Sequence, residues 1–192
     1  MSNIKTQSYE KGQYESNVLL SESHFANFDV IPSYPTPFGY ALNASTGHIN
    51  KWDYSFNGIT NKDSPYSLNI EDPFLSLEAG PFFAFELLDN FYLNVSPMLS
   101  FLLLNTNTKT KYRFIGSYNI SFGFTTDLAF RYVINKIFTI TLGMKASYYP
   151  ISSVSVIDTY RYTTEPIEIK AFSYGFRPYI GIGLKLRWIY IK

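Results

Sequence analysis

The sequence predicts an all-β fold, a single eight-stranded antiparallel up-and-down transmembrane β-barrel, and three observations support this prediction. Only 16% of the residues are charged, against about 25% in ordinary soluble domains. Apolar runs such as residues 101–104 are short, far below the roughly 20 residues that a transmembrane helix needs. Apolar residues instead occupy alternate positions over long stretches, as they do in the strands of membrane barrels.

The alternation is clearest between residues 74 and 190. Leu75 and Leu77 fall on odd positions, while Ser76 and Glu78 fall on even ones. Helical spacing would place charged residues among the apolar ones, so it does not fit these segments. The strands expected here are 74–88, 91–103, 112–132, 138–148 and 180–190.

The connections between these strands alternate in length. Short turns are expected at residues 89–90 and 134–136, and longer loops at residues 105–111 and 150–166. Membrane barrels have short turns on the periplasmic side and longer loops on the outer side. The connections therefore favour a membrane barrel with its longer loops outside the cell.

Residues 1–73 carry a weaker pattern of strands followed by a long loop. Weak strands are expected at 14–20, 24–30 and 38–44, with a proline-rich turn at 32–37 and a loop at roughly 46–71. With the later strands they give a total of eight, and an even number is typical of single-chain barrels. Residues 1–192 are expected to form one domain, because two separate cores would each lie near the lower size limit.

The composition excludes several classes of function. The chain has no cysteine and two histidines, so neither disulfides nor a metal or other cofactor are expected. A net charge of +1 produces no field that would attract nucleic acid. His24 follows Ser23, but neighbouring residues of a strand point to opposite faces, so the two cannot simply act as a catalytic pair. No catalytic residue is predicted, and the chain is not expected to be an enzyme.

Charged residues on the polar face of the strands are predicted to fill the lumen. The interior of an eight-stranded barrel is just wide enough for side chains, so no open channel is expected. Buried charges are tolerated where acids and bases pair with each other. The predicted ion-pair network consists of Glu78, Glu86, Asp127, Arg131, Lys145, Lys185 and Arg187.

Near the end of the chain is the sequence Arg-Pro-Tyr-Ile-Gly-Ile-Gly-Leu, from Arg177 to Leu184, and residues 87–93 are typical of a tight hairpin. Over residues 74–190 the chain resembles small bacterial outer-membrane β-barrels, the family of the outer membrane protein A transmembrane domain. The resemblance implies a location in a bacterial outer membrane. It also implies that the barrel-assembly machinery recognises the last strand through Gly183, Leu186 and Trp188.

Two features depart from this family. Pro81 and Pro97 each remove a hydrogen bond from a strand ladder, so a bulge or a strand end is expected at these positions. Residues Met1 to Lys5 contain no apolar segment of the kind that signal peptides carry. Either the signal peptide is absent because the sequence is a mature form, or the chain is not exported.

The first functional hypothesis is a monomeric, surface-exposed barrel in contact with outer-membrane lipid, with a structural, adhesin-like or ligand-binding role. Residues 152–165 have the Tyr, Ser and Arg composition of adaptable binding surfaces. The candidate residues for a host or envelope ligand are Asp158, Tyr160, Arg161 and Tyr162. The alternative for this segment is a solvated, variable loop.

Two other functions are open at this point. One is an outer-membrane lipid A-modifying acyl enzyme that uses His24 at the barrel rim. The other is a soluble, lipocalin-like barrel that carries a hydrophobic ligand. That third hypothesis requires the odd-numbered face of residues 75–87 to point into the barrel.

Overall fold

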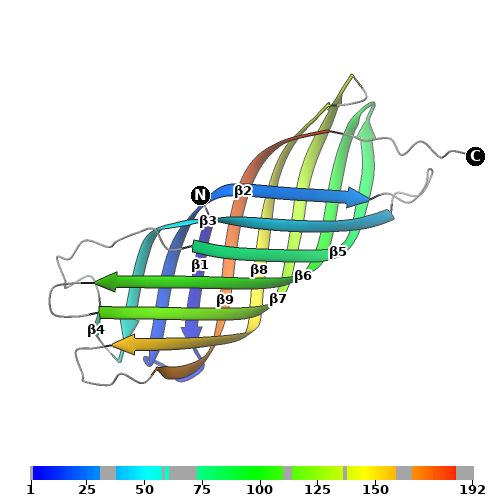
Figure 1. The fold of residues 1–192 in the computed structure, drawn as a ribbon. Helices are drawn as coiled ribbons and strands as arrows, with labels where there is room; N and C mark the ends of the chain where they lie inside the picture. The colour runs from blue at the N-terminus through cyan, green and yellow to red at the C-terminus, as the bar shows by residue number, and fades with distance from the viewer. Residues whose placement is uncertain are drawn as a thin grey trace, which may run out of the picture.

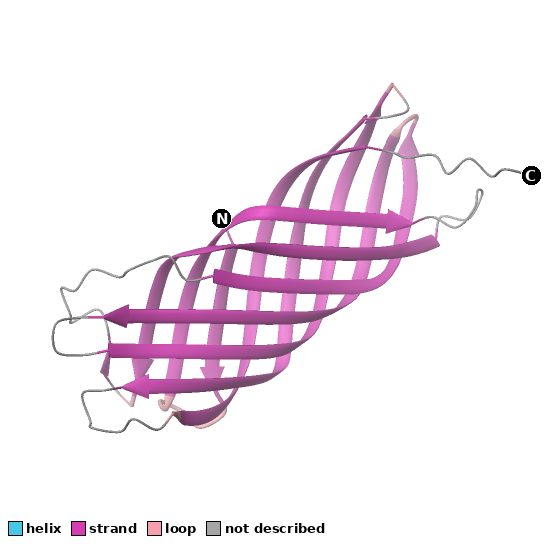
Figure 2. Cartoon of the chain, viewed as in Figure 1, coloured by secondary structure: helices cyan, strands magenta, loops and turns pink. Residues whose placement is uncertain are grey.

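The computed structural model describes residues 2–30, 38–57, 59–60, 73–109, 114–135, 138–158 and 166–184. Strands dominate this part of the chain (Figure 2). They are β1 (Ser2–Ser8), β2 (Tyr14–Val30), β3 (Phe38–Phe56), β4 (Ile59–Thr60), β5 (Pro73–Leu88), β6 (Phe91–Lys109), β7 (Phe114–Ile134), β8 (Phe138–Asp158) and β9 (Ile167–Leu184). Among the described residues, no helix has the length and apolar character needed to cross a membrane.

The strands form one antiparallel sheet that closes on itself (Figure 1). Each strand pairs with its neighbours in the order β1, β2, β3, β5, β6, β7, β8 and β9, and β9 pairs with β1 again. Strand β4 adds only two residues beside β3. Strand β1 is short and lies between β2 and β9. It pairs with β9 from Asn3, which lies opposite Phe176, to Ser8. The predicted eight-stranded antiparallel barrel is therefore confirmed.

The barrel has two different ends. At the first, here named the loop end, β1 connects to β2, β3 to β5, β6 to β7 and β8 to β9. At the second, the turn end, β5 connects to β6 and β7 to β8 through the predicted short turns. Asn90 and Asn135 in these turns have φ angles of 66° and 51°. Asparagine tolerates this left-handed conformation better than most residues, which explains its presence there.

Several strands are longer than the sequence predicts. The segments 14–20 and 24–30 belong to one strand, β2, which has register shifts at Leu19/Leu20 and Glu22/His24. A bulge exchanges the two faces of the alternation, so a continuous strand looks like two in the sequence. Strands β6 and β8 also extend into the segments expected to be the loops 105–111 and 150–166.

Two parts of the N-terminal region are strands although the sequence does not predict them. The inward side chains of β1 are Ser2, Ile4, Thr6 and Ser8. Only Ile4 among them is apolar, so β1 shows no apolar alternation. Strand β3 continues to Phe56 through much of the expected loop 46–71, with polar residues on its outer face.

Pro81 and Pro97 belong to neighbouring strands, β5 and β6. The β5–β6 pairing stops at Ala79 and resumes at Phe83 in the same register, and both prolines lie in this interval. The backbone N–H groups that the two prolines lack are therefore confined to one short stretch of the β5–β6 ladder. The bulge or strand end expected from the sequence is not found there.

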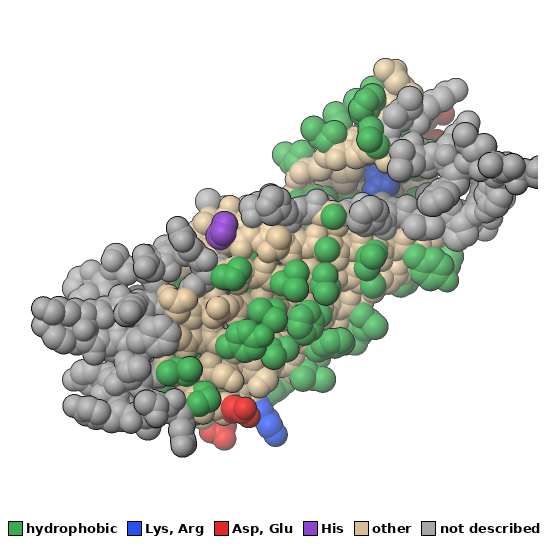
Figure 3. Space-filling model, in the orientation of Figure 1, with side chains coloured by type: hydrophobic (Ala, Val, Ile, Leu, Met, Phe, Trp, Pro, Cys, Tyr) green, Lys and Arg blue, Asp and Glu red, His purple; other side chains and the backbone are tan. Residues whose placement is uncertain are grey.

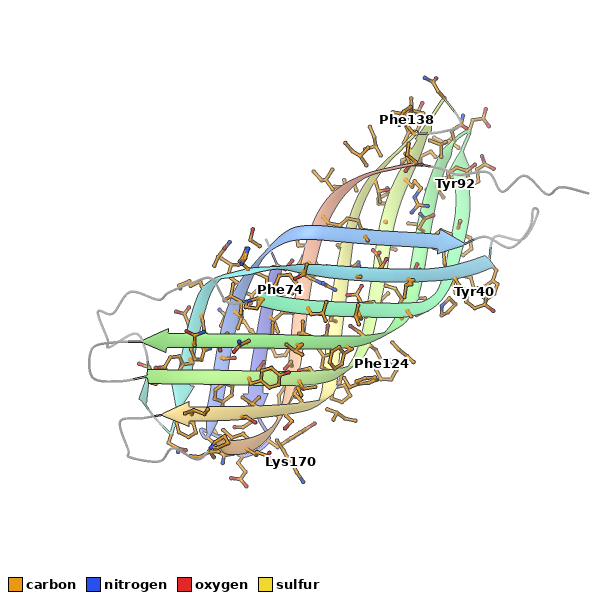
Figure 4. All side chains as sticks on the ribbon, viewed as in Figure 1. Tyr40, Phe74, Tyr92, Phe124, Phe138 and Lys170 are labelled. Carbon is orange, nitrogen blue, oxygen red and sulfur yellow. The ribbon has the colours of Figure 1, made fainter. Side chains whose placement is uncertain are left out.

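The outer surface is apolar toward the turn end. Leu142, Ile180 and Ile182 are 58%, 78% and 84% exposed. Phe124 and Phe138, labelled in Figure 4, are also exposed on this surface. Figure 3 shows apolar side chains spread over the middle of one outer face. Such a continuous apolar exterior on a β-barrel indicates that lipid surrounds it.

The soluble-barrel hypothesis is wrong, because the odd-numbered face of residues 75–87 points outward. Leu75, Leu77 and Phe85 on this face are 38%, 42% and 48% exposed. The opposite face of the same strand is directed into the barrel, and its Ser76 and Glu78 are buried.

Toward the loop end the polarity of the inner face reverses. Here a core of apolar side chains fills the barrel, and we name this part the loop half and the remainder the turn half. The core consists of Ile4, Tyr14, Val18, Leu20, Ile49, Trp52, Tyr54, Phe56, Phe74, Leu102, Leu104, Ile115, Tyr149, Val154, Val156, Ile169 and Ala171.

The outer face of the loop half is polar on β1, β2, β3 and β9, whereas Tyr118, Ile120 and Ile151 are exposed on β7 and β8. It carries charges of both signs at Lys5, Glu15, Lys51, Asp53, Glu168 and Lys170. Lys51 and Asp53 form an exposed ion pair of 2.7 Å, and Lys170 is labelled in Figure 4. Mixed charges outside an apolar core are typical of a protein in water. We therefore expect the turn half to lie in the membrane and the charged side of the loop half to face water.

The orientation of the turn half can be tested with neighbouring residues of β8. Leu142 points outward and Thr141 points into the barrel, where it is 8% exposed. Leu142→Arg should destabilise the folded barrel by about 2–4 kcal/mol, because it places a charge against the hydrocarbon. Thr141→Arg should cost less. Urea unfolding of both variants in lipid vesicles measures the difference, and equal losses would contradict the orientation.

Candidate functional site

Glu78, Lys145 and Arg177 form a buried ion-pair cluster inside the turn half. They come from β5, β8 and β9, and each is at most 3% exposed. Lys145 Nζ donates to Glu78 Oε2 at 2.6 Å, and Arg177 forms an ion pair with the other oxygen of the same carboxylate. One acid is thus held by two bases across the lumen.

Strand register and local hydrogen bonds position this cluster. Lys145 and Arg177 are direct cross-strand partners in β8 and β9, so their side chains share the inner face. The Glu78 carboxylate also accepts hydrogen bonds from Ser76 Oγ at 3.2 Å and Asn43 Nδ2 at 3.3 Å. A buried charge is tolerated when its hydrogen-bonding capacity is used in this way.

Asp127 and Tyr179 form a second polar contact beside the cluster. The Tyr179 hydroxyl lies 2.9 Å from both carboxylate oxygens of Asp127. Asp127 pairs across the strands with Lys145, which places the two contacts in one layer. Gly143 makes this contact possible, because an added Cβ at that position would overlap the Tyr179 ring. The glycine therefore leaves space for the Tyr179 ring beside the strand.

The other residues of the predicted network occupy different environments. Arg131 is half-buried, with its guanidinium carbon 5.7 Å from the centre of the Phe82 ring. Glu86 is exposed near the turn end and is not part of the buried cluster, because β5 reaches the rim there. Lys185 and Arg187 lie outside the described residues.

Arg177 belongs to the cluster, although it is not among the residues of the predicted ion-pair network. It is the first residue of the segment Arg177 to Leu184, which carries the family resemblance. Its odd position between the outward-facing Phe176 and Pro178 could have identified it as an inward-facing base. The alternation rule applied to the whole of β9 would therefore have found it.

Hydroxyl and amide side chains form a separate network between β7, β8, β9 and β1. Ser152 Oγ lies 2.8 Å from Ser121 Oγ and 3.0 Å from Ser173 Oγ. Thr6 Oγ1 lies 2.9 Å from Ser173 Oγ, and Asn119 Nδ2 donates to Thr6 Oγ1 at 3.2 Å. These contacts satisfy buried polar groups at the edge of the apolar core.

The remaining candidate residues are placed only in part. The backbone of His24 pairs with Thr46, and its side chain lies outside the described part of the structure. Asp158 ends β8 at the loop end, opposite Ile115 in β7. Tyr160, Arg161 and Tyr162 lie outside the described residues. Within the described ranges, no group of three or more His, Asp or Glu residues could hold a metal ion.

The ion-pair cluster can be tested by removing one charge. Glu78→Gln keeps the side-chain shape but leaves two buried bases without their carboxylate, so we expect a loss of about 3–5 kcal/mol in unfolding free energy. Glu86→Gln is the matched control, since Glu86 is exposed, and it should change stability by less than about 0.5 kcal/mol. Denaturant titrations in detergent micelles provide the comparison. Equal stability of the two variants would show that the cluster does not hold the strands together.

Comparisons with known proteins give a structural likeness and no match by sequence. No protein-family model and no curated protein matches the chain. Among solved structures, it is similar to a major outer membrane protein from Thermus thermophilus, with a TM-score of 0.48 and 8% sequence identity. The match covers 93% of this chain and 98% of the other. Membership of the outer membrane protein A family stays a prediction, whereas the apolar exterior and the antiparallel ring make this chain an outer-membrane-type β-barrel.

Proposed function

We propose that this chain is a non-conducting, non-enzymatic anchor of a bacterial outer membrane that carries a water-exposed barrel end as a contact surface. The observation that carries the proposal is the exchange of polarity between the two halves of the barrel. The apolar exterior of the turn half contacts lipid, and the polar exterior of the loop half extends beyond it.

The apolar core supports a closed lumen. Trp52, Leu102 and Val154 come from three different strands and are 2%, 1% and 0% exposed. Ions crossing the barrel would have to pass this core without water, which is energetically prohibitive. The charged groups of the turn half also bind each other instead of lining a pore.

The connections support placing the loop half outside the cell. Short turns containing Asn90 and Asn135 join strands at the turn end. The connections that follow β3 and β8 at the opposite end are longer. Outer-membrane barrels have short periplasmic turns and longer extracellular loops. A ligand of the host or the envelope would then meet the surface near Asp158.

Conductance measurements test the closed lumen. The purified chain inserted into a planar bilayer should produce no current steps, because the apolar core blocks the passage. Glu78→Gln should be equally silent, since it leaves the core in place. Regular current steps from either protein would contradict a non-conducting anchor.

Cell-binding assays test the contact surface. Replacing Tyr160, Arg161 and Tyr162 by alanine should reduce the binding of expressing cells to host surfaces or envelope fractions to the level of cells without the protein. Lys51→Ala is the control, because it changes an exposed residue of β3 in the loop half. Undiminished binding by the triple variant, at equal surface expression, would remove these residues from the proposal.

A further inference from the structure

We infer that the turn half accepts one additional β-strand, supplied by another membrane-inserted polypeptide, between β2 and β9. Strand β1 bridges these two strands in the loop half only, and both of them continue past it toward the turn end. This interaction surface lies in the half of the barrel opposite the proposed contact surface. It is independent of the binding role proposed for the loop half.

The bridge formed by β1 ends part of the way along the barrel. Its last pair with β9 toward the turn end is Asn3 with Phe176, and its last pair with β2 is Ser2 with Leu20. Figure 1 places the N-terminus, where β1 begins, between the two ends of the barrel. The described part of the ring is therefore bridged by β1 in the loop half and not in the turn half.

The strands on either side of β1 continue with one open edge each. From Ile180 to Leu184, β9 forms its strand ladder with β8 alone, and from Ser21 to Val30, β2 forms its ladder with β3 alone. Among the described residues, β2 and β9 do not pair with each other. Two open edges therefore border the same side of the turn half.

Exposure on the inner face of β9 agrees with an open edge. Thr141 and Thr139 in β8 are only 8% and 7% exposed. Their cross-strand partners in β9, Gly181 and Gly183, are partly exposed. Both strands present these residues to the lumen, so the difference indicates that the side of β9 away from β8 is uncovered.

The apolar exterior places these edges beside lipid. Ile180, Ile182 and Leu184 on β9 are 78%, 84% and 62% exposed, and Ala26 on β2 is exposed as well. Lipid tails provide no hydrogen bonds, so the backbone N–H and C=O groups of a membrane strand have to pair with protein. One added strand would provide partners for both edges at once.

The register of β1 defines the position of the added strand, because that strand would lie in line with β1. Strand β1 is antiparallel to β2 and β9, so the added strand would run from the turn end toward the loop end. Asn3 of β1 lies opposite Phe176 and Leu19. Six positions closer to the turn end, allowing for the extra residue in the β2 bulge, one residue of the added strand would lie opposite both Ile182 and Ala26.

The edges also define the chemistry of the partner. On β9, Ile180 and Ile182 face lipid, whereas Gly181 and Gly183 face the lumen. The added strand should follow the same alternation, with apolar side chains toward lipid and small or polar ones toward the lumen. Each described strand already has a place in the sheet, so the partner is an extended segment of another polypeptide. Addition of a strand to an open sheet edge is an established mode of peptide recognition.

Disulfide capture of a synthetic peptide tests strand addition, and the absence of native cysteine makes each single-cysteine variant unambiguous. The probe alternates valine and threonine over about nine residues, roughly the length of a membrane strand, with cysteine in place of the central valine. In proteoliposomes, Ile182→Cys and Ala26→Cys should each form a disulfide with this peptide.

Two matched controls lie directly beside the test positions. Ile140 pairs with Ile182, and Ala44 pairs with Ala26, but the strands of these two control residues are paired on both edges. Ile140→Cys and Ala44→Cys should therefore react with the peptide at least about tenfold more slowly. Equal rates at the test and control positions would overturn strand addition.

A second peptide separates strand pairing from simple adsorption to the apolar surface. Replacing two of its threonines by proline removes backbone donors while keeping the peptide uncharged, so capture at Ile182→Cys and Ala26→Cys should be lost. Equal capture of both peptides would overturn the inference, because adsorption does not require backbone hydrogen bonds.

Two further variants identify other occupants of the open edges. The double variant Ala26→Cys/Ile182→Cys should form no internal disulfide without peptide, because two strand spacings of about 4.8 Å exceed the reach of a disulfide. An internal disulfide would show that β2 and β9 pair directly, and would overturn the inference.

Deletion of residues 185–192, which lie outside the described residues, should leave peptide capture unchanged. Capture that appears only after this deletion would show that the end of the chain itself occupies the edges, and would overturn a partner from another polypeptide. None of these outcomes bears on the surface near Asp158, so the proposed function is tested separately.

Discussion

The alternation of side chains along a strand is the constraint on which this structure depends. Each strand presents one face to the lumen and the other to its surroundings, so the surrounding medium determines which residues belong on each face. Lipid around the turn half requires apolar residues outside and leaves charged residues such as Glu78 and Lys145 for the inside. Water around the loop half reverses this requirement, and Trp52 and Tyr149 fill the inside there.

The charged layer and the apolar core close the same lumen by different means. In the turn half, ion pairs across the lumen connect β5 to β8 and β9, so buried charge is kept only where it is paired. In the loop half, apolar packing replaces these pairs. The charged layer also depends on Gly143, because a side chain at this position would overlap the Tyr179 ring that reaches Asp127.

Much of this architecture can be predicted from the alternation of apolar and polar residues. The rest cannot be predicted in this way, for physical reasons. The strands after residue 73 show period-two patterning, since lipid imposes it on their outer face. The bulge at Glu22/His24 hides the continuity of β2, because the additional residue Ser23 exchanges the faces of the strand. The polar inner face of β1 hides that strand altogether. Glu78, Lys145 and Arg177 can each be predicted as inward-facing from alternation, but which of these charges meet depends on a register that no single strand reveals.

The most direct test of this account is a depth profile along β9, whose outward positions run from Ile182 in the turn half to Lys170 in the loop half. Nitroxide labels at successive outward positions, with the protein in a lipid bilayer, report their access to oxygen and to a water-soluble nickel complex. The account predicts oxygen access near Ile182 and nickel access at Lys170, with the change between Tyr174 and Lys170. Equal access at both ends of the strand would contradict the exchange of polarity.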